Sequence, residues 1–258
     1  MARAALRGRL TWQAARVLGV ERETPRASRL RLDAADWPGH LAGQHLDVRL
    51  TAPDGYTAQR SYSIATAWDG ERRLELLVER LDDGEVSPYL TDELRAGDLL
   101  EVRGPVGRYF VLPPDDGRPV QLVAGGSGIV PFLAMLAETG ADARRGPVRV
   151  LCSARTLDDL VGRAELDRPP AGAGVTVTLT GGAPPGWEGP TGRIDAALLA
   201  AHTVPATDRP HVLVCGPTSF VEHVAATLVT LGHDASDIRT ERFGATADSG
   251  GGDGTDVA

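Results

Sequence analysis

A glycine-rich segment in the second half of the chain has the residue types that bind phosphate. It runs from Gly125 to Pro131 with the sequence GGSGIVP, directly after the apolar run 120–124. Glycine lets a backbone approach a ligand, and a helix that begins here presents free N–H groups and the positive end of its dipole. The segment therefore predicts either a phosphate-binding turn or a tight strand-to-helix turn that binds nothing.

A second glycine turn, Cys215-Gly216-Pro217, follows the apolar run 212–215. It would lie at the carboxyl end of a parallel strand, where open α/β sheets bind their ligands. Cys215 could instead be a small buried apolar residue, which is the commoner fate of a free cysteine.

Two shorter segments in the first half have the same two interpretations. In Arg60–Ser63 (RSYS), Arg60 and Tyr62 share one face of a strand; a guanidinium can grip a diphosphate and an aromatic ring can pack on a planar heterocycle. An amphipathic surface strand would look alike. Gly84–Ser87 (GEVS) predicts a second phosphate nest with Ser87 as the N-cap of the next helix, or simply a capped helix.

Short strands must position these segments in the first half. Residues 44–50 alternate, with Leu46 and Val48 on one face, and Gly, Pro or Asp lies at most strand boundaries. One helix interrupts the series from Ser87 to about Gly97. This spacing predicts a closed barrel or a sandwich. The expected strands are 14–20, 28–32, 44–50, 60–66, 74–81 and 99–103.

The second half has a different rhythm, which begins after the linker 113–119 (PPDDGRP). Apolar runs alternate with helical stretches, and this alternation predicts a parallel, doubly wound sheet of five strands. We expect domains at 1–112 and 120–244 and a mobile tail at 245–258. The expected strands are 120–124, 148–152, 175–180, 212–215 and 238–242, and the expected helices are 130–138, 157–166, 195–202 and 219–231.

Composition excludes several kinds of chemistry. All 27 basic residues are arginine, which rules out lysine-dependent P-loop and Schiff-base mechanisms. The net charge of −8 argues against nucleic-acid binding. Two cysteines are too few for a four-thiolate cluster or a four-cysteine zinc site, so we predict no metal site and expect any redox centre to come from an organic cofactor or a partner.

The order of the four segments, followed by Glu241-Arg242-Phe243-Gly244, resembles the ferredoxin–NADP⁺ reductase superfamily. The similarity is greatest to small bacterial ferredoxin- or oxygenase-reductase-like proteins without a fused iron–sulfur domain, and it covers about Trp12 to Gly244. The resemblance implies an antiparallel flavin-binding β-barrel followed by the nicotinamide-binding α/β domain.

The resemblance also implies a flavin site in the first half. Arg60 would bind the flavin diphosphate, Tyr62 would pack on the isoalloxazine ring, and Ser63 would lie near its N5 atom. Gly84, Val86 and Ser87 match the segment that completes the diphosphate site. The family usually holds FAD, and FMN is the alternative.

The nicotinamide site implied by the resemblance lies in the second half. Cys215 would lie beside the nicotinamide C4 atom, with Gly216 and Pro217 continuing that turn. Phe243 would cover the flavin or would be an ordinary core aromatic. Ser63, Cys215 and Glu241 are thus the expected catalytic residues. The diphosphate of the nicotinamide cofactor would meet Gly125, Gly126, Ser127, Gly128, Ile129 and Pro131.

Five residues bear on the choice of nicotinamide cofactor. Ser153, Arg155 and Arg163 suit a 2′-phosphate, whereas Asp158 and Asp159 nearby favour a bare ribose. We expect NADPH, with NADH as the alternative.

The expected activity is hydride transfer from NAD(P)H to bound flavin and delivery of electrons to an acidic ferredoxin or an oxygenase component. Residues 1–35 carry eight arginines and three acidic residues, which would be either a docking patch for that partner or a solvated edge. Two other activities fit the same residues: an NAD(P)H:flavin reductase that releases reduced flavin, and a flavin-bearing electron-relay subunit of a larger complex. We expect a monomer in the cytoplasm, without membrane insertion.

Overall fold

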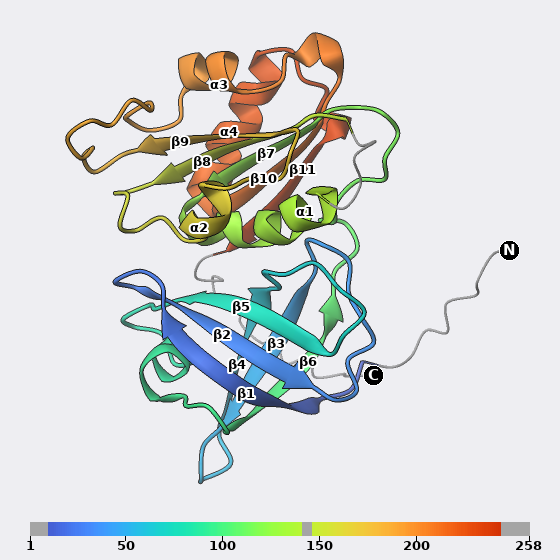
Figure 1. Ribbon diagram of the computed structural model, residues 1–258, viewed down its shortest axis with the longest axis vertical. Coiled ribbons are helices and arrows are strands. Elements are labelled where there is room, and N and C mark those ends of the chain that lie inside the picture. Colours follow the sequence, from blue (N-terminus) through green and yellow to red (C-terminus); the bar gives the residue numbers. More distant parts are fainter. Residues whose placement is uncertain (1–9, 141–145, 244–258) are drawn as a thin grey trace, which may run out of the picture.

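The computed structural model describes residues 10–140 and 146–243, and the chain forms two halves, each built on its own sheet (Figure 1). The first half is a six-stranded antiparallel sheet in the order β4-β3-β6-β1-β2-β5. A bridge between Ile64 and Leu76 joins the end of β4 to β5 and closes the sheet into a barrel, as predicted. The strands are β1 (Gln13–Arg22), β2 (Ala27–Ala34), β3 (His45–Thr51), β4 (Thr57–Ser63), β5 (Arg73–Glu79) and β6 (Leu99–Val106).

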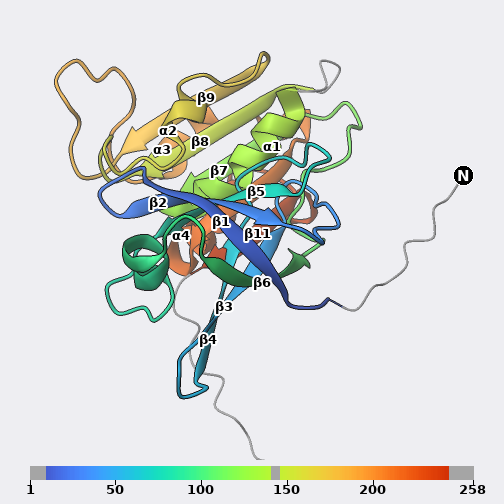
Figure 2. The same ribbon diagram turned by 60° about the horizontal axis from the view of Figure 1, so that its bottom comes forward.

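Alternation along the strands fills the barrel. Leu46 and Val48 of β3 and Leu30 and Leu32 of β2 are fully buried, because residues two apart point to the same face of a strand. The β3–β4 hairpin turns back far from the second half, whereas the residues at its open end, His45 and Ser63, pair with each other in register (Figure 1 and Figure 2).

Two expectations in the first half were wrong in detail. The fourth strand runs from Thr57 to Ser63 rather than from 60 to 66, because the chain leaves β3 after Ser63 to bridge β5. The predicted helix is one short segment whose last turn is the π-helix η1 (Tyr89–Glu93). Ser87 does not cap it, since the Ser87 hydroxyl accepts a hydrogen bond from the backbone N–H of Leu81, at 3.0 Å.

The second half is a parallel sheet in the order β11-β10-β7-β8-β9, with helices on both faces, as predicted. One face packs against α1 and the barrel, and the other packs against α3 and α4. The strands are β7 (Val120–Gly125), β8 (Val148–Ala154), β9 (Ala173–Leu179), β10 (His211–Pro217) and β11 (Ile238–Phe243). The helices are α1 (Val130–Gly140), α2 (Arg163–Leu166), α3 (Ala196–His202) and α4 (Thr218–Thr230), with the 3-10 turns η2 (Gly126–Ile129), η3 (Ala206–Asp208) and η4 (Ala235–Asp237).

The helix expected over 157–166 is reduced to α2. Thr156 donates a side-chain hydrogen bond to Asp159 at 2.6 Å, which favours turns at its start. Gly162 then has φ +72, a left-handed conformation that interrupts any helix running into Arg163.

The two halves share one apolar core. Ala27, Leu77 and Phe110 of the first half belong to the same buried cluster as α1. The rings of Phe110 and Phe132 lie with their centroids 5.8 Å apart. The halves are therefore packed against each other without a water-filled gap at this point.

The linker between the halves is held at the start of the parallel sheet. Asp116 lies 2.9 Å from the Nε2 atom of His211, and Arg118 lies 2.7 Å from Asp237. The tail predicted at 245–258 lies outside the described residues. No helix within residues 10–140 and 146–243 is long and apolar enough to cross a bilayer.

Candidate active site between the two halves

Strand β4 places Arg60 and Tyr62, the two side chains predicted to bind flavin, on one face. Ser61, on the opposite face, donates a hydrogen bond to Asp47 at 2.6 Å. The exposed Arg60 guanidinium donates to the carbonyl of Gln59, and among the described residues no carboxylate is paired with it. Burial raises the pKa of the Tyr62 phenol above its ordinary value. Arg60 is therefore available to an anion beside a neutral aromatic ring.

The turn at residues 81–87 is held by hydrogen bonds within the chain. The N–H of Gly84 donates to the carbonyl of Leu81 at 3.0 Å, and the Ser87 hydroxyl completes the loop through the N–H of Leu81. Val86 and Ser87 are buried, so this turn can offer a ligand backbone groups more readily than side chains. Tyr56, just before β4, donates to Glu85 at 2.9 Å and holds the turn beside β4.

The two glycine turns of the second half touch each other. A Cβ atom on Gly128 would lie 2.3 Å from the carbonyl oxygen of Cys215, and one on Gly125 would lie 2.9 Å from the ring of Phe220. Neither position can hold a side chain without displacing its neighbour. Gly126 differs, because its φ of +56 favours glycine although nothing lies within 4 Å of the missing side chain.

Four polar residues meet where the two halves join. Cys215 and Glu241 are register partners on β10 and β11, and His45 and Ser63 are register partners on β3 and β4. The Nδ1 atom of His45 lies 3.6 Å from Glu241 Oε1, which links the two pairs across the junction. The structure thus places Cys215 beside Glu241 and Ser63 beside His45, and His45, which the sequence analysis did not single out, joins the two pairs.

One carboxylate oxygen of Glu241 is free to accept a further hydrogen bond. Its Oε2 atom is buried and has no hydrogen-bond partner within the described part of the chain. Buried acceptors are normally satisfied, so an unpaired one facing the junction fits a ligand that brings an N–H or O–H group. The carboxamide of a nicotinamide is such a group.

Both cysteines are buried free thiols. Burial raises the pKa of Cys152 to about 12. Burial, together with the charge of Glu241, raises the pKa of Cys215 well above its ordinary value. Cys215 is therefore a neutral thiol near neutral pH, which can shape a pocket but is a poor nucleophile. Among the described residues no three His, Cys, Asp or Glu side chains gather as metal ligands.

Not every predicted contact is a side-chain contact. Ile129 and Pro131 are buried in the shared core, so only their backbones could meet a diphosphate. Phe243 ends β11 in register with Pro217 and is 37% exposed, and it could cover a ring there.

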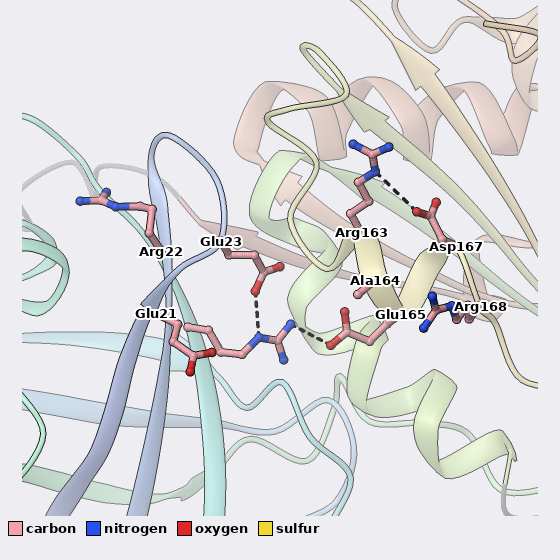
Figure 3. Close-up of a pocket in the computed structure, with 9 residues that line it drawn as sticks. Glu21, Arg22, Glu23, Arg163, Ala164, Glu165, Asp167 and Arg168 are labelled. Atoms are coloured by element: carbon pink, nitrogen blue, oxygen red, sulfur yellow. Dashed lines mark hydrogen bonds and ion pairs between the residues drawn. The ribbon is translucent and has the colours of Figure 1, made fainter.

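The three residues predicted to bind a 2′-phosphate, Ser153, Arg155 and Arg163, do not lie at one site. Ser153 is the next-to-last residue of β8 and lies in register with Gly125. Arg155 lines a cavity of about 330 Å³. The other lining residues are Thr24, Arg26, Glu79, Asp159 and Val161. Arg163 lines a different cavity of about 550 Å³ and lies 3.5 Å from Asp167 (Figure 3). The structure does not bring the two arginines into one site.

Comparison with known proteins gives matches over both halves. A family model described as an oxidoreductase FAD-binding domain matches residues 21–110, and one described as an oxidoreductase NAD-binding domain matches residues 122–226.

Two curated relatives and one solved structure illustrate the range of reductases to which the chain is similar. Ferredoxin–NADP reductase B of Sorangium cellulosum is 33% identical over 222 residues, which cover 81% of this chain and 88% of that protein. NADH-cytochrome b5 reductase 1 of Lodderomyces elongisporus is 28% identical over 197 residues, covering 74% of this chain but only 64% of the relative. The crystal structure of the cytochrome P450 reductase GcoB of Amycolatopsis has a TM-score of 0.78 and 29% identity, over 91% of this chain and 70% of that one.

The contact between the glycine turns predicts a difference between two substitutions. Gly128→Ala forces Cβ into the Cys215 carbonyl and should lower the free energy of unfolding by about 2–3 kcal/mol through overpacking. Gly126→Ala meets open space and should cost about 1 kcal/mol, from its left-handed backbone alone. Urea unfolding of both variants measures the difference. Equal losses for the two would contradict the close packing of the turns.

Proposed function

The chain belongs to the ferredoxin–NADP⁺ reductase superfamily as an NAD(P)H-dependent flavoprotein reductase, and from that premise we propose that it passes electrons from NADPH through FAD to a separate iron-containing protein. The observation that carries this proposal is the junction where Ser63 and His45 of the first half meet Cys215 and Glu241 of the second. A site built from both halves suits a reaction between two cofactors.

The first half has the features that FAD requires. Arg60 would hold the diphosphate together with the backbone of Gly84, Val86 and Ser87, and its freedom from any described carboxylate supports that role. Tyr62 would pack on the ring system, and Ser63 would donate to its reactive edge. The family model that matches here names FAD, which supports FAD over FMN.

The second half would hold the nicotinamide cofactor. The backbone N–H groups of Gly125 to Gly128 would bind its diphosphate, and the turn at Cys215, Gly216 and Pro217 would leave room for the nicotinamide ring. When bound, the two cofactors would supply the redox chemistry, a hydride transfer from the nicotinamide to the flavin, and the protein would hold and orient them.

The residues at the junction would orient this reaction. Glu241 Oε2, which has no partner among the described residues, would accept the carboxamide N–H of the nicotinamide. His45 would hold Glu241 through its other oxygen, and the neutral Cys215 thiol would limit the space beside the ring. Phe243 would cover the outer side of the pocket.

The preference for NADPH rests on Ser153 and Arg155. Arg155 lines a cavity whose two guanidinium groups, Arg155 and Arg26, are balanced by Glu79 and Asp159, and Arg26 is ion-paired with Asp82. The proposal therefore depends on Arg155 itself, for which the described residues show no ion pair. Arg163 is the weaker candidate because Asp167 already lies beside it. Relatives that use either cofactor are known, since one is named as an NADPH-type and another as an NADH-type reductase.

The acceptor would be a ferredoxin or an oxygenase component such as a cytochrome P450, in line with the names of the relatives. Docking of an acidic partner through the arginines of residues 1–35 would depend on few of them. Arg22, Arg26, Arg29 and Arg31 are ion-paired within the chain, Arg16 is exposed, and Arg3, Arg7 and Arg9 lie outside the described residues.

The proposed reaction predicts a specific effect of Glu241→Gln. The FAD-loaded protein should be bleached by NADPH without oxygen, and Glu241→Gln should slow this bleaching by about tenfold or more, since a lost acid–base or orienting group costs at least that much. Flavin content should stay unchanged. Stopped-flow absorbance measures the rate, with Glu222→Gln on α4 as the matched control.

Three results would count against the proposal. Reduction of Glu241→Gln at the wild-type rate would remove Glu241 from the reaction. Flavin that dialyses away would indicate a flavin reductase that releases its product. Failure of both NADPH and NADH to bleach bound flavin would indicate a relay subunit.

The proposed cofactor preference predicts that Arg155→Ala raises the KM for NADPH by about tenfold, because a charge-assisted contact worth about 1.5 kcal/mol is lost. The KM for NADH should change less than twofold. Steady-state kinetics with an artificial acceptor measures both values, and Arg163→Ala serves as the comparison. Equal effects on the two cofactors would rule out Arg155 as the 2′-phosphate ligand.

A further inference from the structure

Arg29 lies on the face of β2 that meets the second half. Ala27, two residues earlier on the same strand face, and Leu77, its register partner on β5, are both buried in the core that the halves share. Leu30 points the other way, into the barrel. The Arg29 side chain is therefore directed at the junction, and it is 18% exposed.

The Arg29 guanidinium meets three carboxylates. Its Nε and Nη1 atoms lie 2.8 Å from Glu23 and Glu75, which belong to the barrel. Its Nη2 atom lies 2.7 Å from Glu165 on α2, in the second half. Figure 3 shows Glu23 and Glu165 approaching from opposite halves. One side chain thus ties its own strand neighbours to the other domain.

A second contact runs beside the first. The remaining oxygen of Glu23 accepts a hydrogen bond from the backbone N–H of Gly162, at 2.6 Å. Gly162 is the left-handed residue at the start of α2, where the loop that begins at Arg155 ends. Glu23 therefore holds the end of that loop while Arg29 holds the helix.

The charges make this junction sensitive to the loss of Arg29. Without the guanidinium, three carboxylates would face one another in a partly buried place, and each would lack a counter-ion. An exposed ion pair such as that of Arg31 with Glu21, both in the barrel, contributes little to stability, because water solvates each charge when the other is removed.

The contacts of Arg29 with Glu165 and of Glu23 with Gly162 lie toward the β8–β9 edge of the parallel sheet, whereas the reactive residues lie toward its β11 edge. Helix α2 follows β8, whereas Glu241 lies on β11, and β7 and β10 separate these strands. His45 and Glu241 hold the β11 side, at 3.6 Å. Arg239 also reaches the carbonyls of Tyr109 and Val111 there. Polar contacts between the halves therefore lie on both sides of the shared apolar core.

We propose that Arg29 is a positioning residue that, through Glu165 and Glu23, fixes the angle at which the nicotinamide half meets the flavin half. The inference rests on the proposed function, because the reaction needs a ring from each half within contact distance. A displacement of about 1 Å between reacting groups can cost up to about a hundredfold in rate, so the tie affects catalysis without touching a cofactor.

The experiment compares three variants of the FAD-loaded protein and adds Arg29→Lys as a conservative fourth. Arg29→Gln removes all three ion pairs of Arg29, and Glu165→Gln removes only its ion pair with the second half, leaving Arg29 paired with Glu23 and Glu75 in the barrel. Arg31→Gln is the matched control, since it removes the same charge two residues along the same strand. Hydrogen–deuterium exchange of the peptide containing residues 160–166 reports on the junction, and anaerobic stopped-flow at saturating NADPH reports on the reaction.

We expect faster exchange at 160–166 in Arg29→Gln and Glu165→Gln, but not in Arg31→Gln. The limiting rate of flavin reduction should fall about tenfold in both, within the range that misplacement produces. Flavin content and reduction by dithionite should be unchanged, and Arg29→Lys should recover part of the rate.

Exchange and reduction rates in Arg29→Gln and Glu165→Gln that match those of Arg31→Gln would overturn the inference. Flavin loss in Arg29→Gln, together with exchange and reduction rates in Glu165→Gln that match those of Arg31→Gln, would also overturn it, because Arg29 would then serve barrel stability alone. A wild-type protein that NADPH does not bleach would instead contradict the proposed function. The exchange comparison, which needs no reaction, would still decide whether Arg29 holds the junction.

Discussion

Gly128 packs against the carbonyl of Cys215 so closely that a Cβ atom would lie 2.3 Å from that oxygen. This contact joins the turn after β7 to the last residues of β10, so that both lie at the carboxyl ends of neighbouring parallel strands. Because no side chain intervenes, backbone N–H groups and the Cys215 thiol occupy a space that larger residues would fill. The rest of the proposed nicotinamide site depends on this packing.

The junction between the halves extends that constraint to the flavin side. A shared apolar core, with Phe110 against Phe132, keeps the halves in contact. Polar contacts at its two sides, His45 with Glu241 and Arg29 with Glu165, restrict how they can turn. A reaction between two rings held by different domains requires such restriction, since orientation is much of what the protein contributes.

The sequence predicted the sheets well because each strand carries its own pattern. Alternation identified β3, and apolar runs between helices identified the parallel strands. Local signals failed where a distant partner decided the outcome. Ser87 has the residue type of an N-cap, yet its hydroxyl binds Leu81. The helix expected before α2 is interrupted at Gly162, whose N–H binds Glu23 of the other half.

The sequence contains the motifs of the candidate site but gives no sign of the contacts that it makes across the two domains. Ser63, Cys215 and Glu241 stood in recognisable segments, whereas His45 begins an ordinary strand and Arg29 is one arginine among many. Only register and domain packing reveal that His45 pairs with Ser63 and reaches Glu241. The pairing of β3 with β4 was the one signal that could have suggested His45.

The central claim is that two rings, one from each half, meet beside Ser63, Cys215 and Glu241. A crystal structure with FAD and NADP⁺ bound tests it most directly. We predict the isoalloxazine against Tyr62, the FAD diphosphate between Arg60 and the turn at 84–87, and the nicotinamide carboxamide on the free oxygen of Glu241. Flavin bound elsewhere, or a Glu241 that stays unpaired with both cofactors present, would contradict the account.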